Sequence, residues 1–311
     1  MTAMVNSAVG EILAALRASG DYVSGEALGN ELGVSRVSIW KYIRNLKQHG
    51  YVIGTSSRGY YLVSSPDLLL PWEITGWEQK VRHYGEVNST MEVAKELAKK
   101  GVEEGTIVVA ESQSRGRGRL GREWSSPVGG IYCTVVLRPK VSPAYAPRIS
   151  LMASVAVART IRDLFGLPAE LKWPNDVLIG GKKVCGILAE MEAETDELKF
   201  VNLGIGMNVN CSISQERATS LRDELGRDVS RKMVLGAVLA EIQRQQNVLT
   251  TDDLLAEWKK LSVTLGREVR VASLGEEISG KAIDVDSDGA LIVACPDGSV
   301  KKVFAGDCLH V

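Results

Sequence analysis

Arginine and glycine alternate in one short segment, QSRGRGRLGR, at residues 113–122. Four arginines and three glycines fall within the eight positions 115–122. Arginine presents a fork of N–H donors that matches phosphate and carboxylate oxygens, and glycine lets the backbone approach a ligand closely. The segment is either a solvated basic loop that binds nucleic acid without sequence preference, or a loop that wraps a small anion. Because it lies between two apolar, strand-like stretches, we expect an anion-binding loop.

A second segment with chemical potential is KWPNDVLIGGKKVCGILAE, residues 172–190. Its PND triplet at 174–176 predicts a turn between strands, and the glycine pair at 180–181 predicts a tight hairpin. Lys183 follows the hairpin on an apolar strand. Such a lysine is either an edge residue whose ammonium group reaches solvent or a fixed positive charge for a carboxylate or phosphate. The pattern leaves both interpretations open.

Two further segments are weaker signals. The glycines of GIGMNVN, residues 204–210, either approach a ligand or only let strands pack closely. Ser89 and Thr90 directly precede a helical pattern. They are most simply its N-cap, although their hydroxyl and N–H groups also suit a polar ligand. The chain has no GxxxxGK[ST] sequence, which excludes a Walker-type nucleotide loop.

Composition narrows the chemistry further. The 311 residues carry a formal net charge of −1 and are 45% hydrophobic, as expected for a globular chain of two or three domains. No apolar run approaches the roughly 20 residues of a membrane span, and no signal-peptide pattern opens the chain. The five scattered cysteines lack a CxxC pair, which favours a reduced, cytoplasmic protein without a cysteine zinc site. With only three histidines, we expect chemistry based on Lys, Arg, backbone N–H groups and a soluble metal ion, without a dedicated protein metal site.

Residues 1–65 have the pattern of a winged helix-turn-helix DNA-binding domain. An amphipathic helix precedes two helices that Ser24 and Ser35 are expected to cap, and two strands flank the turn GTSSRG at 54–59. The last helix, predicted to end at Gly50, carries a basic stripe opposite its apolar face. This stripe is either simply solvated or contacts DNA, and its place on the second helix of the motif favours DNA. The predicted DNA-binding residues are Ser35, Arg36, Ser38, Trp40, Lys41, Arg44, Lys47 and Arg58.

The rest of the chain divides into three parts. Residues 66–76 carry two prolines and no clear period, which is typical of a linker. Residues 77–263 alternate strand and helix patterns and include a helix at 149–165 that is apolar on nearly all sides, so we expect it to be buried. Residues 264–311 hold five short strand patterns separated by turns, and they predict a small five-stranded barrel.

Four motifs follow one another along the chain: NST (88–90), QSRGRGRLGREW (113–124), KWPND (172–176) with GKKVCGIL (181–188), and GIGMNVN. In type, order and spacing they resemble the motifs of the biotin protein ligases, and the two terminal domains match the long, regulatory form of that family. The resemblance covers residues 24–311. It implies an α/β (α+β) catalytic domain of the class II synthetase-like biotin/lipoate ligase type, with an N-terminal winged helix-turn-helix and a C-terminal SH3-like β-barrel. The related lipoate ligases lack GRGRxGR.

The resemblance also implies roles for single residues. The implied catalytic residues are Lys183, Arg119 and Arg117. The residues implied to bind biotin or its adenylate are Ser89, Thr90, Met91, Gln113, Gly116, Arg117, Gly118, Arg119, Arg122, Trp124, Lys183, Gly186, Gly204 and Gly206. Those implied to lie near the nucleotide and Mg²⁺ are Lys172, Asn175, Asp176 and Asn208. The family often has Asn at the position of Met91, and some relatives have a basic residue at that of Leu120.

The implied activity is a two-step biotin ligation. Biotin and ATP form biotinyl-5′-AMP with Mg²⁺, and a lysine of a biotin carboxyl carrier domain then receives the biotin. The chain lacks the acceptor signature AMKM, so it is expected to donate biotin rather than carry it. The long form further implies a biotin-responsive repressor that forms a homodimer with ligand and binds a palindromic operator. Two alternatives stay open: a ligase whose N-terminal domain regulates nothing, and a biotin-sensing transcription factor without turnover.

Overall fold

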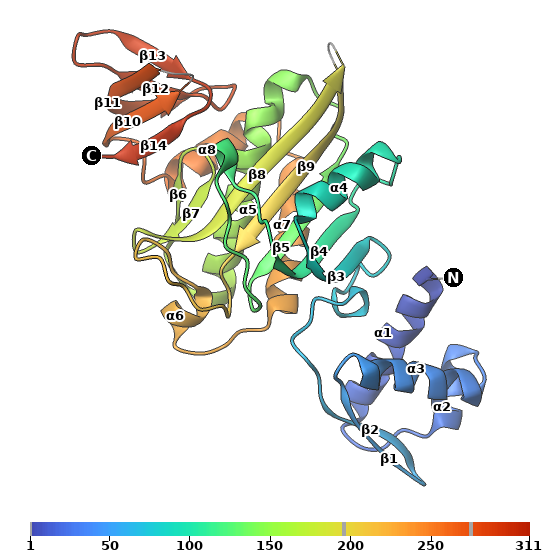
Figure 1. Ribbon diagram of the computed structural model, residues 1–311. Helices are drawn as coiled ribbons and strands as arrows, with labels where there is room; N and C mark the ends of the chain where they lie inside the picture. The colour runs from blue at the N-terminus through green and yellow to red at the C-terminus, as the bar shows by residue number, and fades with distance from the viewer. Residues whose placement is uncertain (1, 195–196, 274–275) are drawn as a thin grey trace. The chain divides into compact units, whose positions relative to one another are not determined.

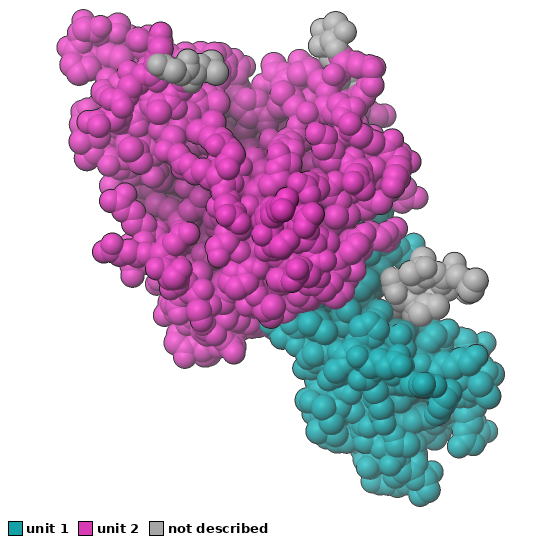
Figure 2. All heavy atoms as spheres, in the orientation of Figure 1, with its two compact units in different colours: residues 1–81 teal, residues 82–311 magenta. Residues whose placement is uncertain are grey.

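The computed structural model describes residues 2–194, 197–273 and 276–311. The chain forms two compact units, residues 1–81 and 82–311, which are coloured separately in Figure 2. None of the helices in the described ranges is both long and apolar enough to cross a membrane.

The N-terminal unit contains three helices and a two-stranded hairpin: α1 (Thr2–Ser19), α2 (Gly25–Leu32), α3 (Arg36–Gln48), β1 (Val52–Ser56) and β2 (Gly59–Ser64). Both predicted N-caps are confirmed, since Ser24 Oγ accepts a hydrogen bond from the Ala27 N–H and Ser35 Oγ accepts one from the Ser38 N–H. Helix α3 ends at Gln48, two residues before the predicted Gly50. The apolar faces of α1, α2 and α3 meet in one buried cluster.

The segment expected to be a linker packs partly within this unit. Leu70 belongs to the buried cluster, and Trp72 packs against it. Within a short 3₁₀ turn, Pro71–Glu73, the Glu73 carboxylate accepts hydrogen bonds from Tyr51 Oη (2.5 Å) and Arg17 (2.7 Å). Burial and this carboxylate raise the pKa of Tyr51 above its ordinary range. The compact unit therefore runs past residue 76 to Val81.

The second unit is built on a seven-stranded sheet whose strand order is β3-β4-β5-β9-β8-β7-β6 (Figure 1). Its strands are β3 (Val81–Val87), β4 (Ile107–Gln113), β5 (Ile131–Leu137), β6 (Ala169–Lys172), β7 (Asp176–Ile179), β8 (Lys182–Glu194) and β9 (Glu197–Met207). The predicted glycine hairpin lies between β7 and β8, where Gly180 and Gly181 both have positive φ. The longest pairing joins β8 and β9 in antiparallel register, with Gly186 opposite Gly206.

Helices cover the sheet and fix the ends of its strands. The helices of this unit are α4 (Thr90–Lys99), α5 (Ala146–Phe165), α6 (Leu221–Leu225), α7 (Arg231–Gln246) and α8 (Asp252–Leu261). Helix α5 is buried along most of its length, as predicted, because it lies between the strands β6–β8 and the helices α7 and α8. Helix α4 packs instead on β4, β5 and β9. The sequence patterns missed β3, which mixes polar and apolar residues, and the five-residue α6.

The five predicted C-terminal strands are confirmed. They are β10 (Glu268–Ser273), β11 (Glu276–Val285), β12 (Leu291–Ala294), β13 (Val300–Val303) and β14 (Asp307–His310). They pair antiparallel in the order β13-β12-β11-β10-β14. Asp307, the first residue of β14, pairs with Arg122 of the Arg/Gly loop, residues 113–122. This small sheet therefore lies against the loop.

Candidate functional site

A cavity of about 350 Å³ lies within the second unit, among the Arg/Gly loop, the start of α4, β8, β9 and the turn before β14. Of the ligand-binding residues predicted from the sequence, only Gly116 is not part of its lining. The predicted residues that line it are Ser89, Thr90, Met91, Gln113, Arg117, Gly118, Arg119, Arg122, Trp124, Lys172, Asn175, Asp176, Lys183, Gly186, Gly204, Gly206 and Asn208. Segments as far apart in the sequence as Ser89 and Cys308 thus meet at one cavity.

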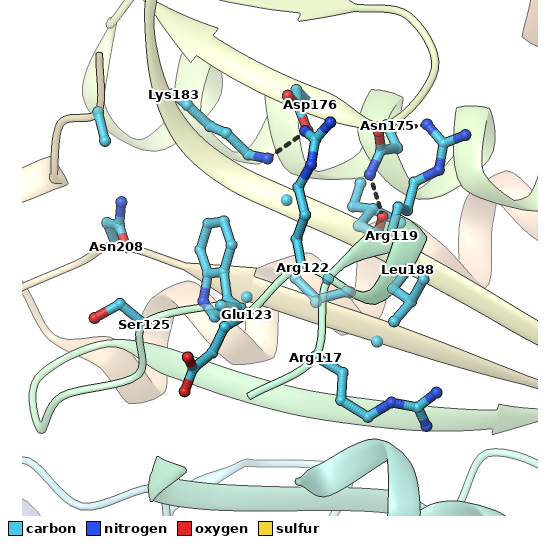
Figure 3. Close-up of a pocket in the computed structure, with 18 of the residues that line it drawn as sticks. Arg117, Arg119, Arg122, Glu123, Ser125, Asn175, Asp176, Lys183, Leu188 and Asn208 are labelled. Atoms are coloured by element: carbon cyan, nitrogen blue, oxygen red, sulfur yellow. Dashed lines mark hydrogen bonds and ion pairs between the residues drawn. The ribbon is translucent and has the colours of Figure 1, made fainter. Parts of the chain in front are cut away.

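Lys183 is held in the cavity as a fixed positive charge. Its Nζ lies 2.7 Å from Asp176 Oδ1 and 5.2 Å from the ring centroid of Trp124. Figure 3 shows Lys183 and Asp176 pointing toward one another across the hairpin. The Lys183 backbone is also fixed, because its N–H donates to Arg217 O and its carbonyl accepts from the Thr219 N–H. Of the two interpretations left open by the sequence, this geometry favours the fixed charge.

Three arginines of the loop contact three different elements. Arg117 pairs with Glu190 on β8 at 2.7 Å, Arg119 donates to Asn175 Oδ1 at 3.2 Å, and Arg122 pairs with Asp307 on β14 at 2.5 Å. Burial lowers the pKa of Arg119, against the effect of nearby carboxylates. The Arg122 hydrogen bond lowers the pKa of the Asp307 carboxyl. Arg117 and Arg122 are thus paired with carboxylates, whereas Arg119 is held by a neutral amide oxygen.

Gly116 belongs to the Arg/Gly loop but contacts other loop residues instead of lining the cavity. A Cβ at this position would lie 2.3 Å from the Trp124 carbonyl oxygen and 2.6 Å from Ser126 Oγ. The Trp124 N–H donates to the Gly116 carbonyl at 2.8 Å, which closes the loop on itself. Glycine is thus required here for close approach between two parts of the loop.

Three glycines of β8 and β9 make room for side chains in the cavity. A Cβ on Gly206 would lie 2.5 Å from Trp124 Nε1, and one on Gly186 would lie 2.9 Å from the same indole. A Cβ on Gly204 would lie 2.6 Å from the Met91 sulfur. The indole of Trp124 therefore packs directly on the backbone of Gly186 and Gly206. A flat group of a ligand could pack on these strands in the same way, because no Cβ atoms are present.

The start of α4 presents free polar groups to the cavity. Ser89 holds the N-cap position, but its side chain makes no capping bond. Instead, Gln113 Oε1 accepts hydrogen bonds from the Thr90 N–H (2.8 Å) and hydroxyl (3.1 Å). Within the described ranges, the buried Ser89 Oγ and Trp124 Nε1 have no hydrogen-bond partner. Because an unpaired buried polar atom is costly, both atoms point to a polar ligand that completes the site.

Of the residues expected near the nucleotide, Lys172, Asn175 and Asp176 belong to the KWPND turn, and Asn208 directly follows β9. Asn175 Nδ2 donates to the Ile187 carbonyl, and Asn208 Nδ2 donates to the Thr219 carbonyl. Lys172 lies close enough to Asp307 to lower the pKa of that carboxyl, after the larger effect of Arg122. In the described part of the chain, no three His, Cys, Asp or Glu side chains gather as a metal site. An Mg²⁺ ion bound here would therefore take most of its ligands from phosphates and water, as is usual for this ion.

Several lining residues were not predicted. Asp307, Gly306 and Cys308 come from the C-terminal sheet, and Glu123 follows the last arginine of the loop. Glu123 directly follows Arg122 in the sequence. This position beside the arginines could have predicted that it lines the same cavity. The contribution of residues 306–308 carries no local signal, because it depends on how the small sheet packs beside the loop.

The predicted DNA-binding residues lie on the N-terminal unit, on α3 and the hairpin. Arg36, Trp40, Lys41, Arg44 and Lys47 are exposed. The Arg44 guanidinium lies 5.6 Å from the Trp40 ring centroid, and Lys47 Nζ donates to Thr55 Oγ1 on β1.

The other predicted DNA contacts are already engaged. Ser35 and Ser38 bond to each other at the N-cap of α3, at 3.0 Å between their Oγ atoms. Arg58, at the turn of the hairpin, stacks on Tyr22 and pairs with Asp21 at 3.4 Å. The free positive charge of this unit is therefore concentrated on the exposed stripe of α3.

Three family models match the chain. The Biotin/lipoate A/B protein ligase family matches residues 84–208, the Biotin protein ligase C terminal domain matches residues 264–311, and an HTH domain matches residues 10–61. The first match contains the Arg/Gly loop, the KWPND turn and Lys183, and the second contains Asp307.

Several proteins are similar over most of the chain. The bifunctional ligase/repressor BirA of Bacillus subtilis is 34% identical over 94% of each chain, and that of Escherichia coli is 30% identical over 95% of each. The biotin–[acetyl-CoA-carboxylase] ligase of Mycobacterium tuberculosis is 36% identical over 67% of this chain and 80% of its own. The structure of the Aquifex aeolicus biotin protein ligase with biotin and ATP matches 75% of this chain and 100% of its own, at 29% identity and a TM-score of 0.65.

Proposed function

This chain belongs to the family of bifunctional biotin ligase/repressor proteins, and from that premise we propose that it makes biotinyl-5′-AMP from biotin and ATP and transfers the biotin to a lysine of a carboxyl carrier domain. The observation that carries the proposal is the single cavity where Lys183, Asp176 and the Arg/Gly loop meet. The ligase and HTH family matches of this chain, and its similarity to bifunctional ligase/repressor relatives, support it.

In the first step, a carboxylate oxygen of biotin attacks the α-phosphorus of ATP, and the bond to the β-phosphate oxygen breaks to release pyrophosphate. Two anions must approach each other, so the barrier is partly electrostatic. We assign Lys183 to the biotin carboxylate and α-phosphate, where a fixed ammonium group offsets the charge that gathers in the transition state. Arg119 and Arg117 add charge from the loop.

The apolar floor of the cavity is the proposed biotin site. We place the planar ureido group of biotin over Gly186, Gly204 and Gly206, where no Cβ limits its approach. Ser89 Oγ, buried and without a partner among the described residues, then supplies a hydrogen bond to the polar head of the ligand. Trp124 lies over Gly186 and Gly206, so we expect the indole to shift when the ligand binds.

Magnesium fits the nucleotide end of the cavity as a companion of ATP. Asp176, with Asn175 next to it in the chain, would hold the ion in part, Asn208 would contact the nucleotide, and the phosphates would supply the other ligands of the ion. When bound, the ion supplies positive charge that offsets the charge of the phosphates. The chain's own residues orient the nucleotide and keep Lys183 in place.

In the second step, the neutral amine of the acceptor lysine attacks the acyl carbon, the acyl–phosphate C–O bond breaks, and AMP leaves while the amine loses a proton. Until the amine arrives, the adenylate must stay bound. We assign this retention to the loop, because Arg117, Arg119 and Arg122 have acceptors that the adenylate phosphate can replace. We place the reaction in the cytoplasm, a setting supported by five cysteines that are all unpaired.

We further propose that the N-terminal unit binds a palindromic operator through α3 when the ligand-bound protein forms a homodimer. The exposed basic stripe on α3 supports DNA contact, and two-fold pairing would present two such helices to the two half-sites. The repressor names of the full-length relatives support regulation by this unit.

One assay tests the enzymatic proposal directly. The protein is incubated with ATP, Mg²⁺, labelled biotin and a biotin carboxyl carrier domain, and label on the carrier's lysine is measured. Transfer at catalytic turnover supports the ligase. Tight adenylate binding without transfer would instead indicate a biotin sensor, and transfer without specific DNA binding would indicate a ligase whose N-terminal unit does not regulate.

A further inference from the structure

A second hollow, of about 340 Å³, lies against the Arg/Gly loop. Its lining consists of the six loop residues 117–122 together with Leu188 and Glu190 of β8. All but Gly121 and Glu190 also line the main cavity, so the loop forms a wall that the two spaces share. An opening on the outer side of the loop gives a reactant other than biotin or ATP a way to reach the reaction centre.

The two spaces are ordered along one face of β8. Residues at alternate positions of a strand lie on the same face, and Gly186, Leu188 and Glu190 follow this spacing. Gly186 lines the main cavity, Leu188 lines both spaces, and Glu190 lines only the second hollow. The carboxylate of Glu190 therefore marks the outer end of a path that leads along β8 to the floor of the main cavity.

Glu190 is the acidic residue among the eight that line the second hollow. Its carboxylate pairs with Arg117 at 2.7 Å, and the Glu190 side chain is 28% exposed. Figure 3 shows Arg117 extending away from the Lys183–Asp176 pair. Because Arg117 also borders the main cavity, an adenylate phosphate and Glu190 compete for the same guanidinium group. When the phosphate takes Arg117, the Glu190 carboxylate is left without its cation.

The other walls of the hollow suit an aliphatic chain. Leu120 is 70% exposed and Leu188 is half-buried, so both present apolar surface to an incoming group. A lysine side chain combines a four-carbon apolar stem with a terminal ammonium group. The stem matches the two leucines, and the ammonium group matches the freed carboxylate.

We propose that the second hollow is the entry subsite for the acceptor lysine, and that Glu190 binds its ammonium group once the adenylate has drawn Arg117 away. This inference rests on the proposed ligase function and names the residue that receives the second substrate. The arginines and Lys183 that hold the adenylate repel an incoming cation, and a carboxylate at the entrance offsets this repulsion. Because Arg117 occupies Glu190 until adenylate is present, the subsite opens only after the first step.

The test compares Glu190→Gln with Glu192→Gln. The control residue lies two positions further along β8, pairs with Lys99 at 3.7 Å and lines neither space. Three rates are measured: adenylate formation, transfer from preformed adenylate to the carrier domain, and reaction of the adenylate with hydroxylamine. Hydroxylamine is a small nucleophile that is uncharged at neutral pH and needs no ammonium site.

For Glu190→Gln we expect kcat/KM for the carrier domain to fall about tenfold, the loss of one charge-assisted contact, mainly through a higher KM. The hydroxylamine reaction should stay within about twofold of wild type, and Glu190→Asp should restore part of the carrier activity. Equal losses with both nucleophiles would overturn the inference, since Glu190 would then only support Arg117. So would an unchanged KM for the carrier. Wild-type protein that makes no adenylate overturns the proposed function, and this inference with it.

Discussion

At the scale of single residues, the site consists of positive side chains whose present partners can be exchanged for a ligand's anionic oxygens. Lys183 faces Asp176, and Arg119 faces Asn175. Neither pair is deeply buried, so exchanging the partner does not strand a charge in an apolar interior. We therefore expect the chemistry to depend on where these charges are held, and single substitutions at them to affect the two steps differently.

Lys183→Ala removes the fixed charge next to the reacting carboxylate and phosphate. By comparison with the loss of one preorganised donor, we expect a barrier higher by roughly 3–4 kcal/mol for adenylate formation, with the fold intact because the side chain is partly exposed. Biotin-dependent exchange of pyrophosphate into ATP measures this step. The exposed neighbour Lys182 provides the control, as Lys182→Ala. Near-normal exchange by Lys183→Ala would remove this residue from the mechanism.

Arg119→Gly tests retention of the adenylate. Arg119 joins the loop to the KWPND turn through Asn175, so its loss should let biotinyl-5′-AMP escape before transfer, by tenfold or more for one charge-assisted contact. The dissociation rate of preformed adenylate is the measurement. Arg115→Gly, at an exposed arginine of the same loop, is the matched control. If both variants retain adenylate as wild type does, the loop does not hold the ligand through Arg119.

Local motifs made many of these residues predictable, and distant partners made others unpredictable. The Arg/Gly loop and the PND turn carry their residue types within a few positions, so the sequence alone places them near an anion. Asp307 lies 185 residues from its partner Arg122, and no local pattern joins them. Ser89 was read first as a cap, but Gln113 bonds the Thr90 N–H instead. The first N–H of α4 is thus bonded by Gln113, at the end of β4, and not by the N-cap residue.

At the scale of elements, the C-terminal sheet contributes lining to the cavity, and α3 carries the exposed basic stripe. The Arg122–Asp307 pair connects β14 to the ligand loop, so the small sheet helps to define the shape of the cavity. On α3 the apolar face enters the buried cluster, while the opposite face presents positive charge. Periodicity predicted both elements because each buries only one face.

The stability of the C-terminal sheet should fall in acid because of His310. Its ring nitrogen Nε2 bonds Thr264 Oγ1 at 3.1 Å, and burial, with Lys172 and Arg267 nearby, lowers the pKa of His310 to about 4. In the unfolded chain this group takes up its proton near pH 6.5. The unfolded state therefore binds more protons between about pH 6.5 and 4, and stability falls as pH falls through that window.

Urea unfolding of the wild type and of His310→Gln between pH 7 and pH 4.5 measures the effect. The substituted protein should lose less of its free energy of unfolding over this range, because Gln takes up no proton in either state. An equally steep pH dependence in both proteins would show that another group is responsible.

Arg44→Ala tests DNA binding by α3. If Arg44 contacts a backbone phosphate, its loss should weaken binding to operator DNA and reduce the slope of log K against log salt by about 1. Fluorescence anisotropy at several salt concentrations gives both values. Gln48→Ala, at an exposed uncharged position of the same helix, should leave the slope unchanged. A slope that does not respond to Arg44→Ala would indicate that the stripe is only solvated.

At the scale of the whole molecule, the proposal joins an enzyme and a regulator through one ligand. In the proposed mechanism the Arg/Gly loop changes its partners when adenylate binds, and a ligand can shift an equilibrium only through such a difference between two states. We expect biotin and ATP together to shift the protein from monomer toward dimer by at least tenfold in the dissociation constant, as measured by sedimentation equilibrium. If the protein dimerises equally with and without biotin and ATP, dimerisation does not link the ligase activity to repression.

The two different hydrogen bonds of the Gln113 amide limit which residue can replace it during evolution. Its oxygen accepts from Thr90 at the start of α4, and its nitrogen donates to Ser126 Oγ, which in turn donates to the Trp124 carbonyl. The side chain must accept a hydrogen bond through one terminal atom and donate one through the other. Glutamate has the same size but, when ionised, two acceptor oxygens and no donor. A single-nucleotide change at such a codon can therefore disconnect helix from loop without altering the volume of either.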